Sequence, residues 1–248
     1  MSPPAKPGDY LIYLQLHRGL TAGYLSGNSF LKETIIAEEA QIEAQIKTVD
    51  ALPAKADFIL NSTDNGNWTL IKTEWQALQA RAVGLSVKES FDSHSALIDK
   101  AIHLLGDISD HSGLTTDQDI GINHLGNLTT FAIPNLIEHL GRLRAGVMAA
   151  MPHERIANED KANLNNLKVH ITKALEHIQH DLAAVATSSP ELGAKIGKFS
   201  PSLEQNINDV FKLTDEIASP LHPEVKADQL FSRFSVPVKN GYALVAAN

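Results

Sequence analysis

Two arginines occupy positions where a helical protein normally carries apolar side chains. Arg18 continues the spacing of four and three residues that begins at Leu11 and Gln15, and Arg144 follows Leu140 by four residues. Such spacings put residues on one face of a helix, so both guanidinium groups and the Gln15 amide are expected to face a core. An ionised group away from water is costly unless a carboxylate, a set of carbonyls or a bound anion compensates it.

The spacing leaves two interpretations of these arginines open. In the first, each guanidinium contacts a bound anion, for which its permanent charge and planar fork of N–H donors are suited. In the second, each arginine buries its stem and reaches solvent or a nearby carboxylate with its head. Arg142 lies farther from the apolar line than Arg144, so Arg144 is the favoured site residue.

The elements expected to position these residues are helices. Apolar residues recur with helical spacing almost throughout, while the period-2 alternation of strands is scarcely present. An all-α fold of about eight helices is predicted, forming two four-helix bundle modules with an elongated arrangement. The clearest single seam consists of Leu164, Ile171, Leu175, Ile178, Leu182 and Val185, and the opposite face carries His170, His177 and His180.

Helix breaks are expected where Gly, Pro, Asn and Ser gather. Pro53 and Pro134 should each kink or interrupt a helix, whereas Pro201 after Ser200 fits a helix start. Residues 1–8 are predicted to be a disordered start, and residues 9–248 a helical domain built as one body or as two stacked modules. The predicted breaks are Gly27–Asn28, Asn61–Asn67, Val83–Val87, Asp110–Asp119, Met151–His153, Ser188–Pro190 and Ser219–Pro223.

Composition narrows the function classes. The formal net charge is -8 and no basic run is present, so a nucleic-acid partner is not expected. The chain has no cysteine, which removes disulfides, thiol catalysis and cysteine metal ligands. No signal peptide or transmembrane run is evident, which predicts a cytoplasmic protein if the chain is complete and a periplasmic one if it is an excised receptor domain.

Catalytic and metal motifs are weak. Glu176-His177-x-x-His180-Asp181 offers two imidazoles one turn apart, but it lacks zinc-protease spacing and lies opposite the apolar seam. Solvated histidines are therefore the favoured interpretation, and neither a metal nor another cofactor is predicted. His94 falls on the apolar side of its helix and is expected to be a hydrogen-bonded core histidine. Nucleophile elbows and phosphate loops are not found, so an enzyme is not predicted.

Two segments resemble a known family of sensory domains. Residues 14–20, Leu-Gln-Leu-His-Arg-Gly-Leu, resemble the Gln-x-x-Arg-Gly signature that opens the nitrate- and nitrite-sensing (NIT) family of bacterial signalling proteins. Residues 134–145 resemble the Leu-Gly-x-Leu-Arg-Ala stretch of such domains. A more diffuse likeness around Trp75, Phe91-x-x-His94 and Ser112-Gly113-Leu114 extends the resemblance to about residues 10–245. The family usually has a glutamate where this chain has His17.

The resemblance implies a ligand-binding sensory domain rather than an enzyme. Its expected site lies between the first and fifth helices, where Arg18 and Arg144, with Gln15 as a polar neighbour, would bind nitrate or nitrite. The bound state would be relayed to an output signalling module or partner. Formation of a homodimer is an open possibility. Two alternatives also remain. The chain could be a helical scaffold or dimerisation module without a ligand, or a chemoreceptor-like sensor of organic acids, whose carboxylates suit an arginine pair equally well.

Overall fold

The computed structural model describes residues 9–51, 60–150, 156–198, 200–219 and 227–246. Within these ranges the regular elements are helices and no strand is present, which confirms the all-α prediction. Eight of the described helices have 17 or more residues, in line with the expected number, and α5 and α8 have eight each. The contacts divide the chain into two compact units, Met1–Ser112 and Gly113–Asn248.

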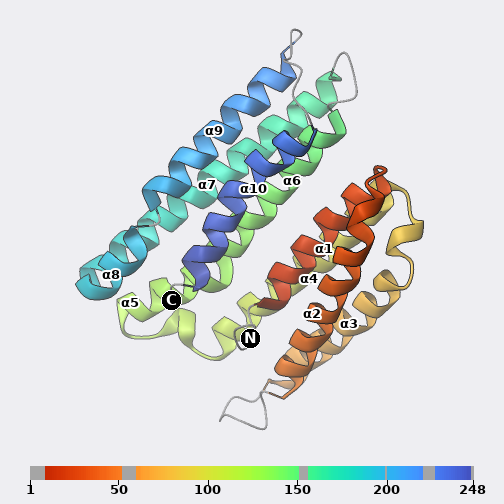
Figure 1. Ribbon diagram of the computed structural model, residues 1–248. Coiled ribbons are helices and arrows are strands. Elements are labelled where there is room, and N and C mark those ends of the chain that lie inside the picture. Colours follow the sequence, from red (N-terminus) through yellow and green to blue (C-terminus); the bar gives the residue numbers. More distant parts are fainter. Residues whose placement is uncertain (1–8, 52–59, 151–155, 199, 220–226, 247–248) are drawn as a thin grey trace. The chain divides into compact units, whose positions relative to one another are not determined.

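The first unit contains four long helices around a shared apolar core (Figure 1). Helix α1 packs against α2 and α4, and α3 packs against α4. Trp75 is completely buried in this core, and its indole N–H donates to Glu43 Oε1 at 3.0 Å. The elements are α1 (Asp9–Leu25), η1 (Ser29–Leu31), α2 (Lys32–Asp50), α3 (Ser62–Gln79), η3 (Ala82–Gly84) and α4 (Val87–His111).

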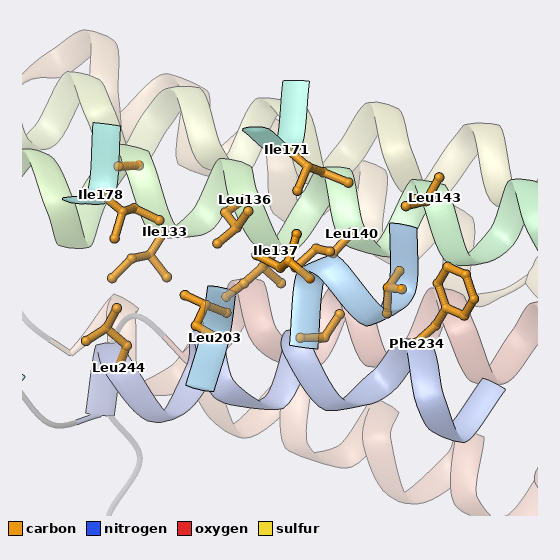
Figure 2. Packing of buried hydrophobic residues seen from close by; sticks show 14 of the residues in the cluster. Ile133, Leu136, Ile137, Leu140, Leu143, Ile171, Ile178, Leu203, Phe234 and Leu244 are labelled. Atoms are coloured by element: carbon orange, nitrogen blue, oxygen red, sulfur yellow. The ribbon is translucent and has the colours of Figure 1, made fainter. Parts of the chain in front are cut away.

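The second unit is centred on α6, which packs against α7 and α10. Figure 2 shows isoleucine and leucine side chains of α6 converging with those of α7, α9 and α10. The elements are η4 (Leu114–Thr116), α5 (Ile120–Asn127), the π-helical turn η5 (Leu128–Ala132), α6 (Ile133–Ala150), α7 (Asn158–Ser188), α8 (Pro190–Gly197), α9 (Ser200–Ala218) and α10 (Ala227–Ala246).

Several local predictions are confirmed. The predicted seam of α7 is buried except for Leu175, which is partly buried. Pro201 lies in the first turn of α9, directly after Ser200. Pro134 lies in the first turn of α6, where a missing N–H is tolerated. The interruption expected at Pro134 takes the form of the preceding π-helical turn, so the chain stays helical from α5 into α6.

The predicted break at Asn61–Asn67 is wrong, because α3 begins at Ser62 and runs through this polar stretch. Asn61 caps the helix by accepting the backbone N–H of Asp64 at 2.9 Å. Asp64 is buried and lies 3.0 Å from the imidazole of His111 on α4. A side-chain cap and a tertiary contact thus support a first turn whose residues have low helix propensity by themselves.

Some predictions fall outside the described residues. They concern the start at residues 1–8, the proline at position 53, the break at residues 151–153 and most of the break at residues 219–223. Among the described helices, none combines the length and the apolar character needed to cross a membrane.

Candidate functional site

Arg18 is buried in the first unit and held by two residues of α4. Its exposed fraction is 2%, and its Nη1 donates to Ser95 Oγ at 2.8 Å. The guanidinium carbon lies 4.9 Å from the centre of the Phe91 ring, within the range of a cation–π contact. Neither of these two contacts carries a negative charge, and together they fix the position and the plane of the guanidinium.

Arg144 has matching surroundings in the second unit. Its exposed fraction is 8%, and its Nη1 donates to Ser235 Oγ at 2.9 Å. The guanidinium carbon lies 4.4 Å from the centre of the Phe231 ring. Ser235 Oγ in turn donates to the Phe231 carbonyl at 2.7 Å. Because its proton is used in this bond, the hydroxyl oxygen accepts from Arg144 with a lone pair. The head of Arg144 on α6 is therefore positioned from α10.

The two arginine environments share a sequence pattern that the spacing of the arginines does not reveal. In each unit the serine follows the phenylalanine by four residues, Phe91 with Ser95 and Phe231 with Ser235. This spacing puts the ring and the hydroxyl one helical turn apart on the same face, so one arginine contacts both. The signal was available as a Phe-x-x-x-Ser repeat, but its meaning depends on an arginine from another helix.

Gln15 and Arg142 have the burial that helical spacing predicts for them. Gln15 is buried, with 4% exposure, and lies one turn before Arg18 on the same face of α1. Arg142, in contrast, is 30% exposed along its side chain, and its Nε donates to Glu138 Oε1 at 2.7 Å. Gln15 and Arg18 belong to the unit Met1–Ser112, whereas Arg144 belongs to the unit Gly113–Asn248.

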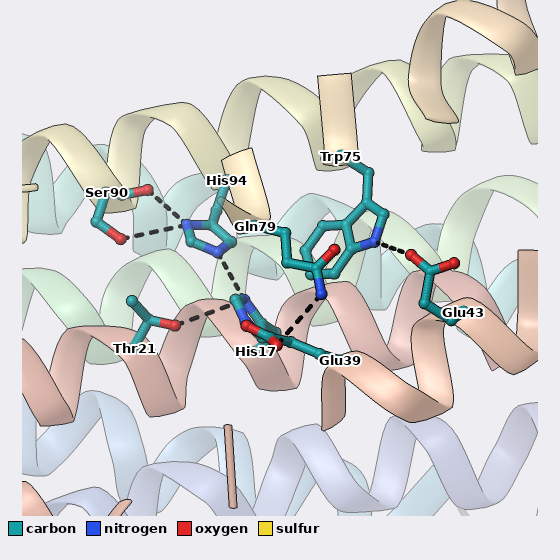
Figure 3. Close-up of polar contacts among 8 residues, drawn as sticks. All are labelled: His17, Thr21, Glu39, Glu43, Trp75, Gln79, Ser90 and His94. Carbon is teal, nitrogen blue, oxygen red and sulfur yellow. Dashed lines mark hydrogen bonds and ion pairs between the residues drawn. The ribbon is translucent and has the colours of Figure 1, made fainter. Parts of the chain in front are cut away.

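A buried pair of histidines lies beside Arg18 in sequence and structure. Figure 3 shows His17 of α1 and His94 of α4 in contact, with Nδ1 of His17 2.8 Å from Nε2 of His94. His94 Nδ1 lies 2.6 Å from the carbonyl of Ser90, which can only accept, so His94 carries its proton on Nδ1. His94 Nε2 is then the acceptor and His17 Nδ1 the donor. The expectation of a hydrogen-bonded core histidine at position 94 is confirmed.

Burial keeps both imidazoles uncharged near neutral pH. Burial lowers the pKa of His17 to about 4 and that of His94 to about 3. His17 Nε2 lies 3.5 Å from Glu39 Oε1 and carries no proton in this tautomer, so the contact becomes an ion pair only if His17 is protonated. The surroundings of Arg18 thus include two polar but neutral rings, which position neighbouring groups without adding charge.

No family model matches the chain, and neither does a curated protein or a solved structure.

Proposed function

We propose that this protein is a helical sensory domain that binds a small oxyanion, nitrate or nitrite in the first place, at Arg18 in the first unit and at Arg144 in the second. The observation that carries the proposal is the matched setting of the two arginines. Each is buried, each donates to a serine hydroxyl, and each lies against a phenyl ring. The NIT-like segments that contain both arginines give the same two positions.

The chemistry of the contacts favours a planar, weakly hydrated anion. A guanidinium offers five N–H donors in a rigid plane and stays charged at any pH that the folded protein tolerates. A serine and a ring that fix this plane before binding reduce the side-chain entropy that a ligand would otherwise have to overcome. Nitrate and nitrite present coplanar oxygens that match such a fork, and the overall charge of -8 does not prevent a locally positive site.

We propose binding without catalysis. The two imidazoles near Arg18 have pKa values of about 4 and about 3, far below the range in which a histidine transfers protons efficiently at neutral pH. A positively charged, fixed guanidinium beside neutral rings serves recognition better than proton transfer. In a sensor, the bound state would be passed to an output module by shifting the balance between two arrangements of the helices.

A thermal-shift screen with the intact chain tests this function. Nitrate, nitrite, acetate and chloride are compared at equal ionic strength, since a ligand bound only by the folded state raises Tm in proportion to RT ln(1 + [L]/Kd). Selective stabilisation by nitrate or nitrite supports the proposal. Stabilisation by acetate alone would indicate an organic-acid sensor. An equal response to all four salts would contradict anion sensing and favour a scaffold whose arginines serve packing.

A further inference from the structure

Three side chains with metal-binding chemistry meet between α5 and α7 of the second unit. Each of His124, His180 and Asp181 offers a ligand atom, and these atoms lie within 4.8 Å of one another. Nδ1 of His124 is 2.8 Å from Asp181 Oδ1, and Nδ1 of His180 is 3.4 Å from the same oxygen. The two rings meet edge to face, with their centres 5.4 Å apart.

The cluster depends on the close approach of α5 to α7. A Cβ added to Gly121 would lie 2.7 Å from the Cβ of Ser188, so only glycine allows this separation. Asp119 caps α5 by accepting the N–H of Gly121 at 2.8 Å, and it also accepts the Ser188 hydroxyl at 3.2 Å. The start of α5 is thereby tied to the end of α7, and His124 follows one turn later against Asp181.

The carboxylate is oriented before any ion binds. Asp181 is 3% exposed, and its Oδ2 accepts a hydrogen bond from the Asn127 side-chain amide at 2.8 Å. Its Oδ1 is left facing the two imidazoles. Metal ligands are commonly fixed in this way by a hydrogen bond to the atom that does not coordinate, which lowers the cost of organising the site.

We propose that His124, His180 and Asp181 form a binding site for a divalent transition-metal ion of the zinc class. Two imidazoles and one carboxylate are donors that Zn²⁺ accepts readily, whereas Mg²⁺ and Ca²⁺ prefer oxygen ligands throughout. Bonds of about 2.0 Å in tetrahedral geometry separate neighbouring ligand atoms by about 3.3 Å, close to the spacings around Asp181 Oδ1.

The remaining coordination position faces solvent. The His180 side chain is 74% exposed, so a water molecule can complete a three-residue site, as in zinc sites that keep an exchangeable position. The His124 proton on Nδ1 moves to Nε2 when Nδ1 binds the ion, because coordination needs the lone pair. Metal ligands must be deprotonated to coordinate, so we expect the affinity for Zn²⁺ to be lower in more acidic solution.

The site differs from the histidine pair visible in the sequence. His177 and His180 are one turn apart on α7, but His177 is exposed and is not part of the cluster. The partner of His180 is instead His124, supplied by a helix far away in the chain. His177 therefore provides a matched control, because it is a solvent-facing histidine of the same helix.

Calorimetric titration of the chelator-treated full chain with ZnCl2 tests the proposal. We expect one ion per chain, a loss of roughly tenfold or more in affinity in His124→Ala and His180→Ala, and no such loss in His177→Ala. MgCl2 should give no binding. His180 is exposed, so its variant should fold normally, and circular dichroism checks this. Absence of Zn²⁺ binding, binding unchanged in His180→Ala, or an equal loss in His177→Ala would overturn the assignment.

Discussion

Arg18 Nη1 donates to Ser95 Oγ at 2.8 Å, so a guanidinium on α1 is held in place from α4. Arg144 and Ser235 make the corresponding bond in the second unit at 2.9 Å. A serine hydroxyl that accepts from a buried arginine fixes the direction of the guanidinium without placing a negative charge on that N–H group. This arrangement, repeated in each unit, is the physical basis of the proposed anion binding.

Replacing the serine should weaken anion binding. In Ser95→Ala the guanidinium loses an acceptor that fixes its plane, and we expect a roughly tenfold lower nitrate affinity and a loss of about 1–3 kcal/mol in unfolding free energy. Ser93→Ala, on the same helix, is the control and should leave both quantities unchanged. Equal nitrate affinities in Ser95→Ala and the wild type, measured by calorimetry, would show that Ser95 does not position Arg18 for binding.

Arg142 should behave as a structural residue. Its bond to the buried carboxylate of Glu138 is partly exposed, so Arg142→Ala is expected to cost about 1–2 kcal/mol in urea unfolding. The nitrate response of the folded variant should stay the same. A variant that loses the response while keeping its stability would reverse the choice between Arg142 and Arg144.

The two buried histidines should make stability depend on pH. Their pKa values of about 4 and about 3 lie below the ordinary value of 6.5, so the unfolded chain binds more protons in mildly acidic solution. Stability is fully present above pH 6.5 and is lost as the pH falls toward these folded-state values. Each histidine should contribute about 1.4 kcal/mol per pH unit below 6.5.

Urea unfolding at several pH values measures this effect. His17→Gln should flatten the dependence of unfolding free energy on pH relative to the wild type, because one titrating group is removed. His103→Gln, an exposed histidine of α4, should leave the slope unchanged. If His17→Gln and the wild type have the same slope, His17 does not titrate as its burial indicates.

The contact of α5 with α7 predicts a contrast between two glycines. Gly121→Ala places a methyl group 2.7 Å from Ser188, so we expect a loss of about 1–3 kcal/mol as the helices separate. A Cβ at Gly66, within α3, meets nothing within 4 Å, and Gly66→Ala should stabilise the chain by about 0.5–1 kcal/mol. Thermal unfolding of both variants measures this difference in stability. A Gly121→Ala variant as stable as the wild type would contradict the close contact between α5 and α7.

The sequence predicts the helices well where periodicity is long and regular. The seam of α7 follows from spacing alone, because five of its six members are buried along a single face. The polar start of α3 could not be predicted from spacing, since the partly buried contact of Asp64 with His111 joins residues far apart in the chain. Helix propensity reflects only the local preference of the residues, and at the start of α3 a tertiary contact outweighs it.

The same limit applies to the candidate sites. The inward position of Arg18 and Arg144 follows from helical spacing. The roles of Ser95 and Ser235 could not be predicted, because each depends on an arginine that another helix brings into contact. His180 is exposed, as its position opposite the apolar seam predicts, but its contact with His124 of α5 could not be predicted from spacing. Pairings between helices depend on packing angles and close contacts, which a hydrophobic pattern does not specify.

The most direct measurement of the central claim is calorimetric titration of the full chain with sodium nitrate against a sodium chloride blank. We expect saturable binding whose affinity at the altered unit falls at least about tenfold in Arg18→Met and in Arg144→Met, while the exposed Arg233→Met keeps wild-type affinity. Circular dichroism should show that the variants remain helical. Nitrate binding that is undetectable in the wild type, or unchanged in both Arg18→Met and Arg144→Met, would contradict the account.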